Sequence, residues 1–417
     1  MQQSAGARAE WKAAWPLPVV SALGYGTAIS YIYSLGIFIE PLESQFRWSR
    51  AEVISGLTIV SIVFVIVAPF TGAFIDRFGS RRLALPGMLA YCAALAALSL
   101  ATASIWSWWL LWVLLALGAV CVQAAVWTTA VASRFERSRG LAIAVTLCGA
   151  GVGSAVAPLL AEFYLTRLGW RGAYVGLAAT FSLLTLPLIF LFFYDAADRP
   201  IADEPVSRDR SRIPGLGVKE ALKSSRFLRM ALLSLAVVTA MTALLVHFVP
   251  ILVGKGLAKP TAAVAASVIG IGSIAGRLGG GVLLDRVRGT ILGAIAFSLP
   301  ILATMALFFY HGGAMGAFFL AALLGVSLGG EVDVLAYLTT RYFGLRNFGT
   351  LFAVIIALQT VALGMGPLIA AAVYDRFGSY DPLLIGLVPV FLISAVIVGT
   401  LGPYPTEFDA ESGGNLR

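Results

Sequence analysis

The chain contains the stretch Gly72-Ala-Phe-Ile-Asp76-Arg77-Phe-Gly79-Ser-Arg81-Arg82, and a shorter copy, Gly281-Val-Leu-Leu-Asp285-Arg286, follows 209 residues later. Two further landmarks recur at the same offset of 209 residues: Pro158 with Pro367, and Gly169 with Gly378. Self-similarity at one fixed distance is typical of a duplicated structural unit. The chain is therefore expected to consist of two related halves.

The segments on either side of these stretches are long and apolar. Of the 417 residues, 59% are hydrophobic and only 12% are charged, whereas a soluble domain carries about 25% charged residues. The apolar excess must face lipid, which excludes a soluble enzyme, a nucleic-acid-binding protein and a disordered chain. The three cysteines lie in apolar runs and there are two histidines, so neither a metal site nor a disulfide framework is expected.

A membrane-spanning helix needs about 20 mostly apolar residues. Twelve such runs lie near residues 15–42, 51–75, 83–102, 106–131, 141–165, 172–194, 227–253, 261–284, 289–310, 314–338, 350–374 and 382–403. The predicted fold is all-α and integral to the membrane, with twelve transmembrane helices in two six-helix bundles related by the repeat. The expected domains are an N-terminal bundle (1–194), a cytoplasmic linker (195–226), a C-terminal bundle (227–403) and a cytoplasmic tail (404–417).

Lys and Arg residues set the expected orientation, because cytoplasmic loops are enriched in them. With the N-terminus inside, 21 of the 29 Lys and Arg residues fall in cytoplasmic segments and seven fall in outside loops. This distribution predicts a multi-pass protein of the cell (inner) membrane with both termini in the cytoplasm.

The stretch Gly72–Arg82 between the second and third runs resembles the signature loop of the major facilitator superfamily, and its degenerate copy lies where the repeat predicts it. The resemblance implies a transporter whose loop charges latch the cytoplasmic ends of the two bundles. The residues implied in this gating are Asp76, Arg77, Arg81, Asp285 and Arg286. Alternatively, these are interfacial charges that only set topology.

Several shorter stretches resemble the monocarboxylate porter branch of that superfamily, which includes the oxalate–formate antiporter. They are Phe46-Arg47-Trp48-Ser49-Arg50, Gly169-Trp170-Arg171, Gly276-Arg277 and Gly330-Glu331-Val332-Asp333. The porters carry an Arg in the eighth span that holds the substrate carboxylate. Arg277 matches its spacing from the loop acid, so the resemblance implies this role for Arg277.

Arg277 lies eight residues before Asp285, so at about 1.5 Å of rise per residue it is about 12 Å from the cytoplasmic helix end. A guanidinium at that depth is costly unless it is paired or functional, and its planar fork suits a carboxylate. The alternative is a snorkelling or structurally paired arginine.

Glu331 and Asp333 lie at a similar depth in the tenth span, but two residues on a helix are about 200° apart, so they face opposite ways. Alignment with the oxalate porter puts two pocket positions of that relative on Leu328 and Val332, on the Glu331 face. We therefore expect Glu331 to pair with Arg277 and to be the main proton-coupling group. Asp333, also a candidate for coupling, is expected to pack against span eleven. A purely structural ion pair is the alternative for Glu331.

Other polar and aromatic residues within the apolar runs are candidates for substrate contact: Thr27 and Tyr31, Gln123 and Trp127, His247 and Gln359. His247 could carry protons or bind substrate, and it could equally be a hydrogen-bonded packing residue. The other residues could likewise be polar contacts that hold helices together.

These features predict a secondary active transporter that moves a small organic anion by alternating access. The expected substrate is a monocarboxylate, because only one fixed cation lies at membrane depth. We expect it to be moved together with a proton. The lipid bilayer is the expected surrounding, and neither a cofactor nor a catalytic residue is expected in this monomer. A proton-antiport exporter of drugs or metabolites is the main alternative. A membrane-bound sensor or a membrane enzyme fits less well, because the polar segments are short and no catalytic cluster is evident.

Overall fold

The structure is a computed structural model that describes residues 8, 10–135, 138–195, 215–284, 286–344 and 347–405. The side chains of Pro69, Ala73, Asp76 and Val332 lie outside the described part. Asp285 and most of the predicted linker and tail are outside it as well.

Helices make up almost all of the described chain. The first half contains α2 (Pro16–Ala28), α3 (Ser30–Phe46), α4 (Arg50–Phe78), α5 (Arg81–Ala97), the short 3-10 helix η1 (Leu98–Leu100), α6 (Ile105–Val120), α7 (Ala124–Arg134), α8 (Arg139–Leu147) and α9 (Gly149–Phe192). The second half contains α10 (Val218–Lys223), α11 (Ser225–Gly254), α12 (Lys259–Leu284), α13 (Gly289–Phe308), α14 (Ala314–Phe343), α15 (Phe348–Phe377) and α16 (Asp381–Gly399). An all-helical chain is what a lipid environment requires, because helices satisfy their own backbone hydrogen bonds.

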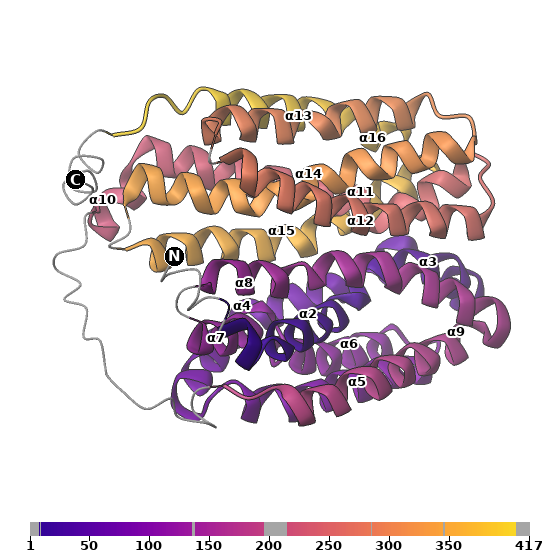
Figure 1. The fold of residues 1–417 in the computed structure, drawn as a ribbon. Coiled ribbons are helices and arrows are strands. Elements are labelled where there is room, and N and C mark those ends of the chain that lie inside the picture. Colours follow the sequence, from indigo (N-terminus) through magenta and orange to yellow (C-terminus); the bar gives the residue numbers. More distant parts are fainter. Residues whose placement is uncertain are drawn as a thin grey trace.

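Eleven helical segments are long and apolar enough to cross a membrane in the described residues, one fewer than the sequence predicts. One of the eleven, Arg139–Phe192, is 54 residues long, far beyond the roughly 20 residues that span a bilayer. Its helical path breaks at Gly169, which has φ 67° and ψ 178°, a conformation open mainly to glycine. In Figure 1 the chain turns back along the molecule in this helix. The twelve-span count and the internal repeat stay predictions.

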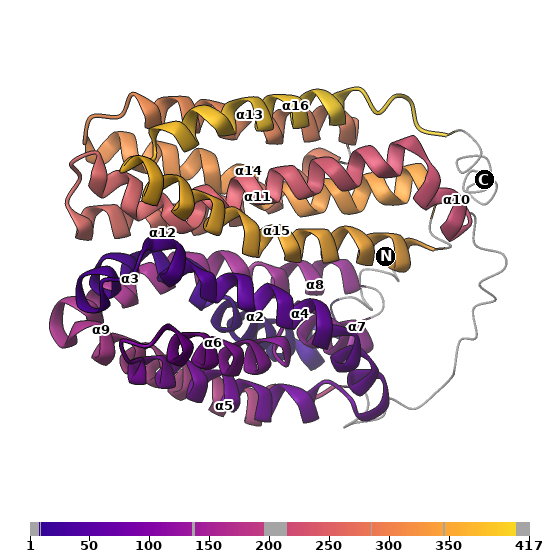
Figure 2. The same ribbon diagram turned by 180° about the vertical axis from the view of Figure 1, so that it is seen from behind.

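The two halves of the chain form two layers of helices that lie against each other (Figures 1 and 2). Helices α2–α9 occupy one layer and α11–α16 the other, and the layers meet along α9 with α12 and along α4 with α15. The exact domain boundaries stay predictions. The start of α2 and the end of α16 lie toward the same end of the molecule (Figure 1). We call this the inner end and the opposite end, with the turns at 46–50, 254–259 and 377–381, the outer end.

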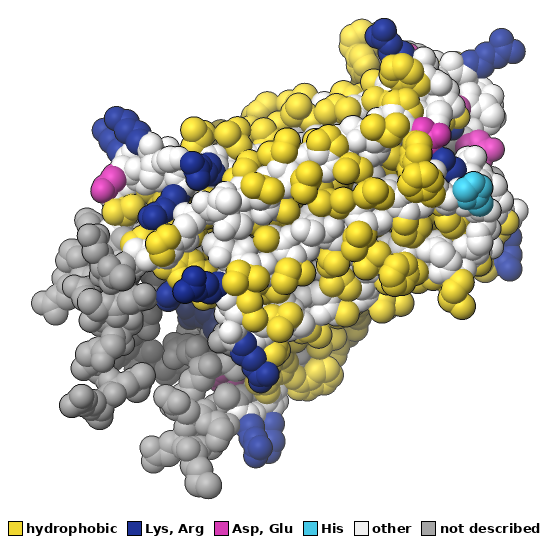
Figure 3. Space-filling model, turned by 90° about the horizontal axis from the view of Figure 1, so that it is seen from above, with side chains coloured by type: hydrophobic (Ala, Val, Ile, Leu, Met, Phe, Trp, Pro, Cys, Tyr) yellow, Lys and Arg dark blue, Asp and Glu magenta, His cyan; other side chains and the backbone are white. Residues whose placement is uncertain are grey.

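The surface has the charge distribution of a membrane protein. Apolar side chains cover the middle of the face shown in Figure 3, and the charged side chains gather toward its two ends. Large apolar side chains such as Phe70, Leu183 and Ile271 are more than half exposed. A soluble monomer rarely exposes so much contiguous apolar area, so this belt is the surface that faces lipid.

Candidate functional site

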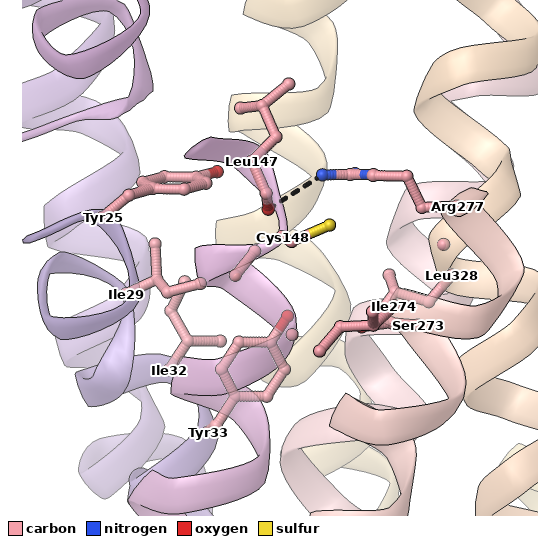
Figure 4. A pocket seen from close by; sticks show the side chains of 13 residues that line it. Tyr25, Ile29, Ile32, Tyr33, Leu147, Cys148, Ser273, Ile274, Arg277 and Leu328 are labelled. Carbon is pink, nitrogen blue, oxygen red and sulfur yellow. Dashed lines mark hydrogen bonds between the residues drawn. The ribbon is translucent and has the colours of Figure 1, made fainter. Parts of the chain in front are cut away.

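A cavity of about 170 Å³ lies between the two halves, and Arg277 is the charged residue among those that line it. Tyr25 and Tyr33 line it from the first half, and Ser273 lies one helical turn before Arg277 on α12. Figure 4 shows both tyrosine side chains and the Arg277 guanidinium around this space. The remaining lining is mostly apolar. Such a site offers a few polar anchors within an apolar wall, as small-molecule sites do.

Two interrupted helices form the first-half wall of the cavity. Helix α2 ends at Ala28 and α3 begins at Ser30, with Ile29 between them at φ −100° and ψ 0°. Helix α8 ends at Leu147 and α9 begins at Gly149. Ile29, Leu147 and Cys148 all line the cavity. Helix interruptions leave backbone groups unpaired, and in transporters they are placed where those groups can meet a ligand or a charge.

Arg277 makes a hydrogen bond at the junction between α8 and α9. Its Nη1 donates a hydrogen bond of 2.9 Å to the carbonyl oxygen of Leu147, the last residue of α8, as Figure 4 shows. Cys148, the residue after Leu147, keeps helical torsions of φ −60° and ψ −18°, so this carbonyl accepts from Arg277 at a slight irregularity within one helical path. The contact also joins the two halves, because Leu147 belongs to the first half and Arg277 to the second.

The acidic partner of Arg277 is Asp333, not Glu331, which corrects the pairing expected from the sequence. The Nε of Arg277 lies 3.3 Å from Oδ2 of Asp333. The reason is the close approach of α12 and α14 at Gly329, where an added Cβ would collide with the carbonyl oxygen of Ser273 and lie 2.7 Å from the backbone nitrogen of Arg277. Asp333 lies one turn beyond Gly329 on the same face of α14, and Glu331 is rotated away by about 200°.

Glu331 is 2% exposed, and its Oε1 atom has no hydrogen-bond partner among the described residues. It does not line the cavity, although it lies two residues after Gly329, which does. Burial of an ionised carboxylate without a partner is costly. Glu331 is therefore a titratable group beside the cavity that Arg277 does not neutralise directly.

Four other predicted contact residues lie in helix-packing positions of the first half and do not line the cavity. Tyr31 packs within the first half, with its ring centroid 6.0 Å from that of Trp112. Trp127 is fully buried and donates a 2.7 Å hydrogen bond to the carbonyl of Val122. Thr27 is buried, and Gln123 donates to Thr71 at 3.1 Å. The expected polar-aromatic faces therefore serve packing in this structure.

The two predicted contact residues of the second half are also outside the cavity. Gln359 donates a 3.1 Å hydrogen bond to the hydroxyl of Ser234. His247 is fully buried, with Nδ1 2.6 Å from the Tyr380 hydroxyl and Nε2 3.0 Å from the carbonyl oxygen of Pro367. Of the two interpretations of His247, the structure favours the hydrogen-bonded packing residue.

The predicted gating residues are described only in part. The side chain of Asp76 and the whole of Asp285 lie outside the described residues. Arg81 donates to the carbonyls of Phe193 and Phe190 at 2.8 and 2.7 Å, which ties the start of α5 to the end of α9 within one half. Arg77 and Arg286 are exposed. Their part in gating stays a prediction.

The sequence reasoning missed Tyr25, Tyr33, Cys148 and Ser273. Residues 25, 29, 32 and 33 follow the spacing of one helix face, so this face could have been read from the sequence. Tyr31 lies off that face. Cys148 lines the cavity between α8 and α9, and the sequence carries no clear signal for this position.

Comparison with known proteins shows which family has this architecture. Residues 20–367 match the family model of the Major Facilitator Superfamily. The chain is 26% identical over 168 residues to human monocarboxylate transporter 6, a match that covers 40% of this chain and 33% of the human protein. It is 22% identical to monocarboxylate transporter 10 of Danio rerio, over 85% of this chain and 69% of the relative.

A solved structure has the same fold. The crystal structure of a point mutant of the nucleoside transporter NupG superposes with a TM-score of 0.74 over 93% of this chain and 99% of the other, at 10% identity. The resemblance read from the signature loop is confirmed, and both the fold and the relatives are those of transporters and not of enzymes. On these matches, and on the two helical layers with a central cavity, the chain belongs to the Major Facilitator Superfamily.

Proposed function

We propose that this chain carries a small monocarboxylate across the membrane by alternating access, with Arg277 as the group that binds the carboxylate. The observation that supports this most strongly is the Arg277 guanidinium in a small, mostly apolar cavity between the two halves. An arginine at such a depth is retained for a function or a pair, and its fork matches a carboxylate in geometry and charge. Relatives named monocarboxylate transporters agree with this chemistry.

The size and charge of the cavity favour a small substrate with one carboxylate. Its volume of about 170 Å³ is below the roughly 300–1,000 Å³ of sites for drug-sized ligands. Among its lining residues Arg277 alone carries a charge, so a second carboxylate would have no fixed cation there. Ile29, Ile32 and Ile274 provide an apolar wall for a short carbon chain.

Binding would require the substrate to compete for Arg277. The guanidinium is held by the Leu147 carbonyl and by Asp333. A bound carboxylate would take over the contact with Leu147 and so weaken a link between the halves. Asp333 would remain as the group that orients the guanidinium from within the second half.

Glu331 would couple transport to protons. Its carboxyl group is buried and has no ion-pair partner among the described residues, and moving an uncompensated buried charge costs several kcal/mol. A proton on Glu331 would remove that charge and allow the loaded carrier to reorient. The empty, deprotonated carrier would reorient slowly, which links net uptake to the proton gradient.

The orientation also belongs to the proposal. Both termini, the linker and the inner end would face the cytoplasm, and the protein would work as a monomer in the inner membrane. The Lys and Arg distribution supports this orientation, and the start of α2 and the end of α16 lie toward the same end of the molecule (Figure 1).

A binding screen tests the substrate class. Purified protein is heated in detergent with aliphatic and hydroxy monocarboxylates, matched dicarboxylates and uncharged amides, each at two pH values. We expect monocarboxylates to raise the melting temperature of the wild type and not that of Arg277→Ala. Stabilisation by bulky cationic or neutral drugs alone would contradict the proposal and favour the exporter.

A further inference from the structure

The outer end holds a set of contacts between the halves that the substrate site does not use. Helix α4 of the first half begins at Arg50, and the Asp375 carboxylate of the second half accepts hydrogen bonds from the backbone nitrogens of Arg50 and Ala51, at 3.0 and 2.9 Å. The next nitrogen, that of Glu52, donates to the Ser49 side chain of its own half. The first backbone donors of α4, which have no partner within a helix, are thus satisfied partly from the opposite half.

The Arg50 side chain strengthens the same junction. Its guanidinium carbon lies 3.4 Å from the ring centre of Tyr374, its Nη1 donates to the Tyr380 hydroxyl at 2.7 Å, and its Nε donates to Glu43 at 2.8 Å. Tyr374 and Tyr380 belong to the second half and Glu43 to the first. An arginine held between an aromatic face and two oxygen acceptors is well fixed.

His247 fixes the Tyr380 hydroxyl for this contact. Because the Pro367 carbonyl can only accept, Nε2 of His247 carries the hydrogen of that 3.0 Å bond, which leaves Nδ1 of the neutral ring as an acceptor. Tyr380 therefore donates to His247 at 2.6 Å and accepts from Arg50. Burial raises the pKa of Tyr380, against the opposing effect of Arg50, so the hydroxyl keeps the proton that it donates.

We propose that Asp375 and Tyr380, with His247 as a positioning residue, form a latch that holds the α4 helix end and Arg50 and so keeps the outer end closed. The proposal rests on the alternating access of the proposed function. Close packing of α3 on α11, where an added Cβ on Gly36 would collide with the Val246 carbonyl, and an ion pair of 3.2 Å between Lys259 and Glu40 close the same end. The latch bonds are exposed at Asp375, which makes them weak enough to break in each cycle.

Cys148 is a native reporter for this latch, because it lines the central cavity. In a Cys92→Ala, Cys121→Ala background it is the single thiol of the chain. A membrane-impermeant methanethiosulfonate is applied to intact cells for the outer face and to inverted vesicles for the inner face. The ratio of the two labelling rates reports the preferred opening and needs no knowledge of the substrate.

We expect Asp375→Ala and Tyr380→Phe each to raise the outer-to-inner labelling ratio, by roughly two- to thirtyfold for Asp375→Ala, the range that loss of a helix cap gives. Asp381→Asn is the matched control, since Asp381 pairs with Lys255 at 2.7 Å within the second half at the same end. Tyr374→Phe is the second control, because it keeps the ring under Arg50. Both controls should leave the ratio unchanged.

The role of His247 is tested by comparing the labelling ratios of the single variants with that of the double variant. His247→Ala should raise the ratio in the reference background and add nothing in a Tyr380→Phe background, because its effect passes through that hydroxyl. A simple loss of stability would raise labelling from both faces and would add to Tyr380→Phe. An unchanged ratio in Asp375→Ala and Tyr380→Phe, or an equal rise in Asp381→Asn, would overturn the latch. If the labelling ratio rises in the latch variants while no carboxylate raises the melting temperature of the protein, the latch is supported and the proposed substrate class is contradicted.

Discussion

Arg277 and Asp333 form an ion pair of 3.3 Å between α12 and α14. The sequence predicts that Glu331 both pairs with Arg277 and couples transport to protons, but the pairing belongs to Asp333 instead. Asp333 pairs with the Arg277 charge from within its own half, although Nε of Arg277 has no hydrogen-bond partner among the described residues. Glu331, two residues earlier, is buried with an unpartnered Oε1 among the described residues. The site therefore contains a cation paired with Asp333 and a second, buried acid that is not its partner.

Substitution of Arg277 should separate the contribution of its positive charge to carboxylate binding from that of its planar guanidinium fork. Arg277→Lys keeps the charge but loses the fork, and Arg277→Ala loses both. A hydrogen bond to a charged group contributes about 1.5–3 kcal/mol, so we expect carboxylate affinity in Arg277→Ala to fall by roughly ten- to a hundredfold while the protein still inserts. Uptake and binding by purified protein measure this. Arg167→Lys, an arginine that stacks on Phe163 away from the cavity, is the control. Wild-type transport by Arg277→Ala would make it a structural residue.

Glu331→Gln should uncouple transport from protons. The amide mimics the neutral acid, so the variant should bind substrate and exchange it across the membrane, but uptake should lose its acceleration at low outside pH. The pH dependence of uptake and counterflow in proteoliposomes are the measurements. Retained acceleration in Glu331→Gln would remove Glu331 from the coupling scheme.

Asp333→Asn should have the opposite pattern. It removes the ion pair with Arg277, so affinity and thermal stability should fall, whereas the acceleration of uptake at low pH should persist. The same pH series checks this variant. If Asp333→Asn abolishes the acceleration and Glu331→Gln does not, then the coupling acid is the partner of Arg277.

Gly329→Val should destabilise the second half. An added side chain would meet the backbone of Ser273 and Arg277 on α12, and overpacking of this kind costs about 1–3 kcal/mol. We expect a lower melting temperature and a weakened Arg277–Asp333 pair. Gly279→Ala is the control, because nothing lies within 4 Å of an added Cβ there. Because Ala and Val both form helices more readily than Gly, an equal loss in both variants would show that the helix contact at Gly329 is not responsible.

A reporter fused after Arg208 tests the orientation. We expect activity only on the cytoplasmic face, because the predicted linker around this residue is rich in Lys and Arg and cytoplasmic loops retain such residues. Activity restricted to the outer face would invert the topology and exchange the inner and outer ends.

Hydrophobicity and charge act locally along the chain, and the features that depend on them can be read without coordinates. The apolar runs predict the helices, the signature stretch Gly72–Arg82 predicts the family, and the depth of Arg277 marks it as a candidate binding group. Each of these inferences needs only the residue type and its distance from a helix end.

The partners of these residues depend on how the helices approach one another, which no local pattern contains. Because Gly329 has no side chain, α12 and α14 approach closely there, and Asp333 rather than Glu331 becomes the ion-pair partner of Arg277. Tyr25, Tyr33 and Leu147 line the cavity, whereas Tyr31 packs within the first half. Two residues along a helix point about 200° apart. The sequence gives the depth of Glu331 and Asp333 in the membrane but not which of them faces α12. The partner of Arg277 is therefore decided only by the packing of the helices.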